Sequence, residues 1–94
     1  MSFRHIVLFR IREGVGEAEI EGAQSELRAL SSSPEVIRWR IERSSDYRKG
    51  TILIEDATFA DVSAFTRFRE TPAHRAAGAR LASIADWWIG DYEE

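Results

Sequence analysis

Two histidines are the residues of this chain best suited to proton chemistry. His5 lies in the segment RHIVLFRIR, and His74 follows a proline in RFRETPAHRAAGARL. An imidazole with an ordinary pKa of about 6.5 can accept or donate a proton near neutral pH, so either residue could be a general base or acid. If both meet in one cavity, one can act as base and the other as its partner. Otherwise His5 is a partly buried strand residue and His74 a helix-start residue.

Other catalytic arrangements find little support in the sequence. A metal ion needs several ligands around one point, whereas the acids available beside the histidines are scattered over strand-like segments: Glu55, Asp56, Asp86 and Asp91. The segment GVGEAE lacks the lysine of a phosphate-binding loop, and no Gly-x-Ser-x-Gly elbow occurs. We therefore predict no metal site, no nucleotide or other cofactor, and no serine hydrolase chemistry.

Length, composition and charge limit the kinds of partner. The 94 residues suffice for one domain, residues 1–94, and 44% of them are hydrophobic, as in a folded globular protein. A net charge of −3 argues against nucleic acid, because the phosphate backbone attracts basic proteins. There is no cysteine, and the apolar run at residues 6–9 is too short to span a membrane. We predict a cytoplasmic protein without membrane or nucleic-acid partners.

Hydrophobic periodicity predicts an alternation of strands and helices. Strands are predicted over residues 3–12, 36–43, 51–59 and 85–94, and helices over about 17–31, 61–70 and 74–83. The strand over 36–43 has one polar face and suits a sheet edge. The strands over 3–12 and 51–59 are apolar on both faces and suit the centre. Asp61 is expected to cap the helix that follows it.

The order β-α-β-β-α-β, with the second helical region interrupted once, is typical of the ferredoxin-like α+β fold. In this fold a four-stranded antiparallel sheet carries its helices on one face. At least three strands also place large apolar side chains on the other face, and a large exposed apolar patch usually marks an interface. Two copies packed sheet against sheet would bury that face, so we predict a homodimer.

The first strand gives an expectation for the position of His5. If Ile6 and Leu8 point at the helices, the pleat sends the alternate side chains to the opposite face. That second set consists of His5, Val7 and Phe9. His5 would then line the inside of the expected dimer.

The surroundings of His74 supply the other half of the expected pocket. His74 lies where two helical pieces meet, and a helix start leaves backbone donors unpaired. Apolar side chains near either histidine are candidate substrate-binding residues: Val7, Phe9, Phe65, Phe68 and Trp87. Nearby arginines could hold an anionic substrate or form a solvated helix face: Arg67, Arg69, Arg75 and Arg80.

Four segments of the chain resemble the stress-responsive A/B barrel, or Dabb, family. They are RHIVLFRIR, DATFADVSAF, TPAHRAA and the closing WIGDY, and the likeness covers nearly the whole length. The resemblance implies a ferredoxin-like α+β domain whose sheets join, in a dimer, into a central barrel. This agrees with the fold that periodicity predicts.

The same segments are similar to those of a plant polyketide cyclase of this family. By position, the resemblance implies that His74 is the base of an aldol closure and that His5 lines the pocket. Phe68 stands where the cyclase has an assisting tyrosine, and it carries no hydroxyl. The family includes stress proteins as well as enzymes, so family and fold do not fix the activity.

Three functions therefore remain open. The first is a homodimeric barrel that binds a small hydrophobic, carbonyl-bearing metabolite, with His74 as base and His5 as orienting partner in a cyclisation or isomerisation. The second is a non-catalytic stress-responsive or ligand-carrying dimer whose barrel is filled by its own side chains. The third is a haem-dependent or cofactor-free monooxygenase, which related barrels include.

Overall fold

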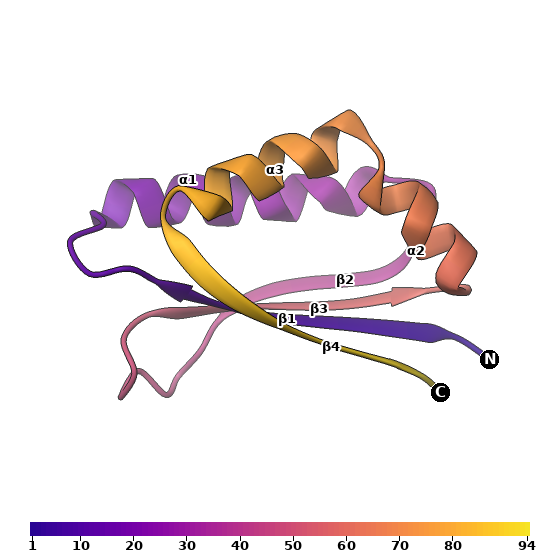
Figure 1. Cartoon of the computed structure of the whole chain (residues 1–94), viewed down its shortest axis with the longest axis horizontal. Coiled ribbons are helices and arrows are strands. Elements are labelled where there is room, and N and C mark those ends of the chain that lie inside the picture. The colour runs from indigo at the N-terminus through magenta and orange to yellow at the C-terminus, as the bar shows by residue number, and fades with distance from the viewer.

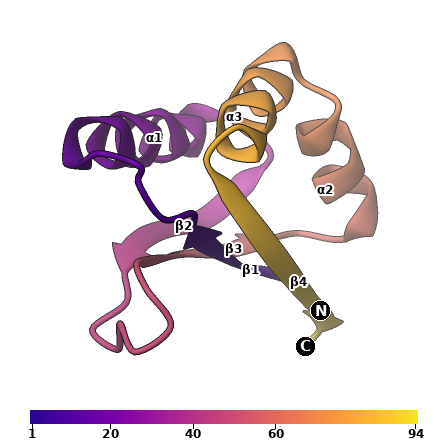
Figure 2. The same cartoon turned by 60° about the vertical axis from the view of Figure 1, so that its left-hand side comes forward.

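The computed structural model describes residues 1–94 as one antiparallel sheet covered by helices (Figure 1). The elements are β1 (Phe3–Ile11), α1 (Glu17–Ala29), a 3₁₀ turn (Leu30–Ser32), β2 (Val36–Arg43), β3 (Ile52–Phe59), α2 (Val62–Arg69), α3 (Pro72–Ala82) and β4 (Ala85–Glu93). The strands lie in the order β2-β3-β1-β4, and every pairing is antiparallel. All helices lie on one face of the sheet, with α1 and α3 side by side and α2 at one end (Figure 2). The predicted ferredoxin-like α+β fold is confirmed.

Side-chain caps explain why the second helical region divides into two helices. Asp61 caps α2 by accepting a hydrogen bond from the backbone N–H of Ala64 at 2.8 Å. Thr71 then caps α3 through the N–H of His74 at 3.2 Å, and Pro72 occupies the first turn, where its missing N–H costs nothing. His74 thus lies in the first turn of α3.

Strand β1 faces the helices with the set of side chains that includes His5. The buried members of this set are Phe3, His5, Val7, Phe9 and Ile11. Phe65 of α2 packs on them, with its ring centroid 5.2 Å from that of Phe3 and 4.4 Å from that of His5. The expectation that His5, Val7 and Phe9 face the inside of a dimer is therefore wrong. Both faces of β1 are apolar at its centre, so periodicity alone could not choose between them.

Strands β2 and β3 take the predicted edge and central positions. Trp39 and Ile41 of β2 turn toward the helices, and the indole N–H of Trp39 donates to the carbonyl of Leu27 at 3.0 Å. Ile37 alternates with Trp39 and Ile41 in the sequence, but it is 64% exposed. The pairing of β2 with β3 shifts by one residue between positions 36 and 38, and this bulge turns Ile37 outward.

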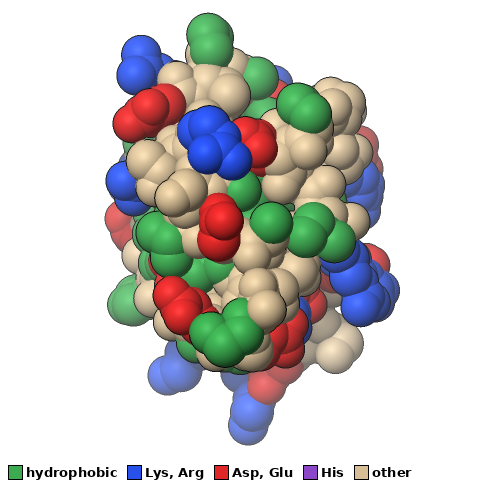
Figure 3. Space-filling model, turned by 90° about the vertical axis from the view of Figure 1, so that its right-hand side faces the viewer, with side chains coloured by type: hydrophobic (Ala, Val, Ile, Leu, Met, Phe, Trp, Pro, Cys, Tyr) green, Lys and Arg blue, Asp and Glu red, His purple; other side chains and the backbone are tan.

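The face of the sheet opposite the helices carries a group of apolar side chains. This outer sheet face is defined by Leu8, Ile52, Ile54, Trp88 and Tyr92. Trp88 is 62% exposed there. No helix lies on this face of the sheet (Figure 1). By contrast, the end of the molecule near the chain termini mixes basic, acidic and apolar side chains (Figure 3). No helix is long and apolar enough to cross a membrane.

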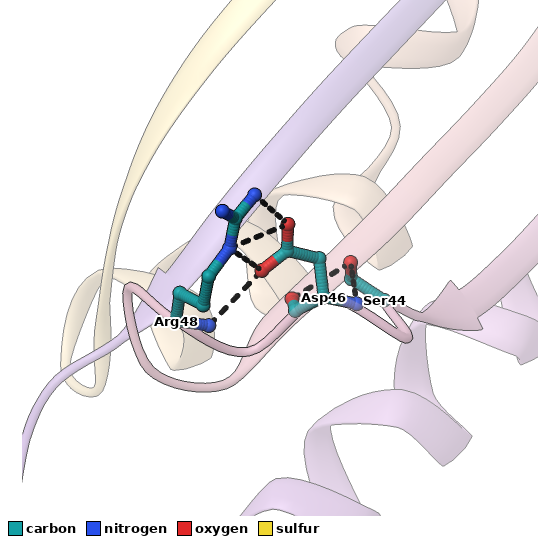
Figure 4. Close-up of polar contacts among 3 residues, drawn as sticks. All are labelled: Ser44, Asp46 and Arg48. Carbon is teal, nitrogen blue, oxygen red and sulfur yellow. Dashed lines mark hydrogen bonds and ion pairs between the residues drawn. The ribbon is translucent and has the colours of Figure 1, made fainter.

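The β2–β3 loop has the polar sequence SSDYRKG, residues 44–50, which is typical of a turn. Asp46 accepts hydrogen bonds from the backbone N–H of Arg48 at 3.0 Å and from its guanidinium at 2.7 Å (Figure 4). Ser44 accepts from the N–H of Asp46 at 3.1 Å. Gly50 closes the loop with a φ of +93°, a conformation that costs glycine little. These contacts are local in sequence and exposed to solvent.

Candidate functional site

A cavity of about 120 Å³ lies between the sheet and the helices. Most of its wall is apolar and comes from β1, α1, α3 and β4. Its polar lining consists of five side chains: His5, Glu55, Arg69, His74 and Asp91. An apolar cavity with a few converging polar groups is the usual form of a small-molecule site.

Three of these polar groups form one cluster, which we call the His5 cluster: His5, Glu55 and Asp91. His5 pairs directly with Asp91 across β1 and β4, and Glu55 on β3 lies diagonally opposite His5. Asp91 Oδ1 is 2.6 Å from His5 Nδ1, and Glu55 Oε2 is 3.2 Å from His5 Nε2. His5 is 4% exposed and Glu55 3%, so the cluster is largely screened from water.

The cluster favours the protonated form of His5. Burial opposes protonation, but the adjacent carboxylates of Glu55 and Asp91 outweigh it and raise the pKa of His5 above its ordinary value. Each ring nitrogen of His5 faces a carboxylate. His5 is therefore protonated more readily than an ordinary histidine, and it is less suited than His74 to act as a base.

The surroundings of His74 favour its neutral form. Burial lowers the pKa of His74 despite the opposing influence of Glu55, and the positive charges of His5 and Arg69 lower it further. Its ring meets that of Phe68 edge to face, with centroids 5.2 Å apart. A neutral imidazole in a cavity has a lone pair that can accept a proton, so His74 is the candidate base.

Arg69 is the remaining charged group of the cavity. Its guanidinium carbon lies 5.5 Å from the ring centroid of Phe65, and it forms no ion pair with any carboxylate of the chain. Arg67 and Arg80 pair with Glu35 and Glu26 on the surface. Of the four arginines noted near His74, only Arg69 lines the cavity.

Most of the predicted pocket residues do line this cavity. His5, His74, Val7, Phe9, Phe65 and Trp87 are among its lining residues. Phe68 is not: its side chain is fully buried, and it packs against Phe59 and Trp39 as well as His74. Its predicted place among the substrate-binding residues is corrected to a supporting position behind His74.

Sequence reasoning missed the partnership of Glu55 and Asp91 with His5. Both acids were noted only as isolated candidates for a metal. Each acid lies two residues from an apolar side chain, which was a signal that both share one face of their strand. Their pairing with His5, however, depends on the order of three strands. No group of three or more His, Asp or Glu side chains is placed to hold a metal ion.

Comparison with known proteins gives one curated relative and several solved structures. The chain is 35% identical to the uncharacterized protein SCO4036 of Streptomyces coelicolor, over 96% of this chain and 97% of that protein. The relative carries no described activity.

Three solved structures illustrate the shared fold. A dimeric ferredoxin-like protein of unknown function from Thermobifida fusca has a TM-score of 0.89 at 24% identity, covering 100% of this chain and 92% of that one. Hydroxynitrile lyase from Passiflora edulis has a TM-score of 0.84 at 19% identity, covering 97% and 91%. SnoaB, a cofactor-independent oxygenase from Streptomyces nogalater, has a TM-score of 0.81 at 19% identity, covering 99% and 92%.

The family itself is shown by a match over almost the whole chain. Identities below a quarter limit what the solved structures show to the fold. The family described as the stress responsive A/B barrel domain matches residues 3–94, which include every residue of the cavity. This chain belongs to the stress-responsive A/B barrel (Dabb) domain family.

Proposed function

We propose that this protein binds a small hydrophobic, carbonyl-bearing metabolite in the cavity and that His74 removes a proton from the carbon beside the carbonyl. The observation that carries the proposal is that two histidines line one apolar cavity and that their pKa values are shifted in opposite directions. Environments that push the pKa values of two titratable groups apart are characteristic of sites in which one group acts as acid and the other as base.

The proposed reaction assigns a separate task to each imidazole. The neutral ring of His74 takes the proton, and the bonding electron pair moves into the carbonyl to give an enolate. The positive charge of His5 stabilises the negative charge that develops in the cavity. His74 then returns its proton, either to a different carbon in an isomerisation or to the alkoxide formed when the enolate attacks a second carbonyl.

The active form in this proposal is a homodimer packed through the outer sheet face. Trp88 and Leu8 are exposed on neighbouring strands there, and an uncovered apolar patch is costly for a single domain of this size. The Thermobifida fusca protein of the same fold is described as dimeric. Sedimentation should give twice the chain mass, and Trp88→Asp should shift it to the monomer.

Proton exchange offers a direct test of the base. Small ketones from acetone to acetophenone would be incubated with the protein in D₂O, and deuterium entering beside the carbonyl would be followed by proton NMR. His74→Gln should lower the catalysed rate by roughly 10²- to 10⁴-fold, the usual contribution of a general base. A rate that is unchanged by this substitution would remove His74 from the mechanism.

Two further variants show whether the exchange occurs in the cavity. Arg75→Gln alters an exposed residue next to His74 that does not line the cavity, so it should leave the rate unchanged. Gly78 lines the cavity, and a Cβ built there meets no atom within 4 Å. Gly78→Leu should therefore extend a side chain from the cavity wall into the cavity and abolish the exchange.

A second candidate is a ligand-carrying dimer without catalysis. Phe68 favours it, because this residue packs against His74 and has no hydroxyl that could assist a base. Under this alternative, ligands still shift the NMR signals of the cavity residues, but none exchanges protons faster than in buffer. The lyase and the oxygenase of the same fold support the catalytic proposal over this one.

A further inference from the structure

One buried acceptor of the cavity has no hydrogen-bond donor. Glu55 Oε2 is buried and has no hydrogen-bond partner, although it lies 3.2 Å from His5 Nε2. That contact is close enough for ion pairing but is not a well-formed hydrogen bond. A carboxylate oxygen has two acceptor sites, so at least one of them meets no donor of the chain. Buried polar atoms without partners are rare and call for a specific explanation.

No other side chain of the cavity donates a hydrogen bond to this oxygen. His5 Nδ1 contacts Asp91 at 2.6 Å, and Arg69 and His74 also line the cavity but form no hydrogen bond or ion pair with Glu55. The charge of Glu55 is already balanced in part by His5, so the unmet need is for a hydrogen-bond donor rather than for another cation. Burying an ammonium group against apolar walls would be costly. A neutral O–H group has the required donor and a smaller cost of desolvation.

We propose that Glu55 binds a hydroxyl group of the cavity's ligand, which is therefore a hydroxy-carbonyl compound bearing an alcohol, phenol or enol O–H. The inference rests on the proposed function for the carbonyl half of the ligand. The hydroxyl donates to Glu55 Oε2 on the sheet, while the carbonyl end lies toward His74 on α3. A cavity of about 150 Å³ can hold benzene, so this smaller cavity of about 120 Å³ limits the ligand to no more than one six-membered ring.

Phenol and toluene form a matched pair of probes, since they differ in one hydroxyl against one methyl. Affinities would be measured by NMR titration of the backbone amides, with benzylammonium as a cationic third probe. Toluene is the more hydrophobic, so it binds more tightly unless a hydrogen bond favours phenol. We expect phenol to bind at least as tightly as toluene, and the Glu55 carboxyl ¹³C signal to move with phenol only.

Two substitutions on the same strand sharpen the test. Glu55→Gln keeps the shape but replaces a charged acceptor by a neutral one, and should lower the ratio of phenol to toluene affinity about tenfold. Asp56→Asn is the matched control, because Asp56 is the next residue on β3 and pairs with Arg4 on the outer face. That variant should leave the ratio unchanged. If Glu55→Gln does not fold, the Glu55 carboxyl ¹³C signal of the native protein still shows whether phenol contacts this group.

The outcomes separate this inference from the proposed function. Tighter binding of toluene or benzylammonium than of phenol would overturn the role of Glu55. An equal ratio of phenol to toluene affinity in Glu55→Gln and Asp56→Asn would do the same. Either result counts even if His74-dependent proton exchange is observed. A Glu55-dependent preference for phenol without any proton exchange would support the hydroxyl site and remove the catalytic role of His74. If no probe shifts the amides of the cavity, the hydroxyl site is wrong.

Discussion

The His5 cluster and the β2–β3 loop both pair carboxylates with a cation, but they differ in every respect that matters for function. The cluster joins three strands that are far apart in sequence, and its His5 and Glu55 are buried, while the Asp91 side chain is 30% exposed. The loop pair, Asp46 with Arg48, joins residues two positions apart and is exposed (Figure 4). Both pairs shift a pKa, so charge pairing alone says little about function. Pairing inside a cavity places the shifted group where it can act on a ligand.

Removing the cation of the cluster should have the largest effect. His5→Ala leaves the carboxylate of Glu55 buried, with Asp91 nearby and no positive partner between them. Breaking a buried ion pair in this way typically costs about 3–5 kcal/mol. Urea unfolding followed by tryptophan fluorescence would measure the loss. A loss below about 1 kcal/mol, the range of exposed pairs, would show that the cluster is not the buried pair described above.

Removing one flanking charge should have a smaller effect. Asp91→Asn keeps an oxygen that can accept from His5 Nδ1, and the Asp91 side chain is 30% exposed, so water can replace part of the lost interaction. We expect a loss of about 1–2 kcal/mol in the same unfolding experiment, the scale of one charge-assisted hydrogen bond. The pKa of His5, followed by proton NMR, should fall at the same time. An effect as large as that of His5→Ala would mean that Asp91 rather than Glu55 dominates the cluster.

The pH dependence of stability should separate the two histidines. The pKa of His5 is raised on folding, so its stabilising contribution is complete below the unfolded value of about 6.5 and is lost as pH rises through the folded value. The pKa of His74 is lowered, so its contribution is present above 6.5 and is lost as pH falls through its folded value. His5→Gln should thus flatten the stability profile above pH 6.5, and His74→Gln should flatten it below. Identical profiles for the two variants would contradict the opposite shifts.

The same contrast explains which parts of the molecule the sequence could predict. The turn at residues 44–50 and the cap at Asp61 depend on near neighbours, and periodicity was enough to place the edge strand β2. The prediction of which face of β1 meets the helices was wrong, because alternation is ambiguous in a strand that is apolar on both sides. The His5 cluster could not be assembled either, since it requires the strand order and register around β1. Contacts between near neighbours can be predicted from a single sequence, while contacts across strands depend on the whole fold.

The smallest effect is expected at the exposed pair. Arg48→Ala removes a guanidinium that is 87% exposed, but it keeps the backbone N–H that Asp46 caps at 3.0 Å. The melting temperature should stay within experimental error, because water replaces the lost contact. The guanidinium and the backbone of Arg48 together lower the pKa of Asp46, so the variant should raise that pKa toward its ordinary value in a carboxyl ¹³C titration. A titration that moves without a measurable change in melting temperature would show that this local ion pair shifts a pKa and contributes little to the fold. A clear drop in melting temperature would instead make the loop pair comparable to the cluster, and burial would no longer explain the difference between them.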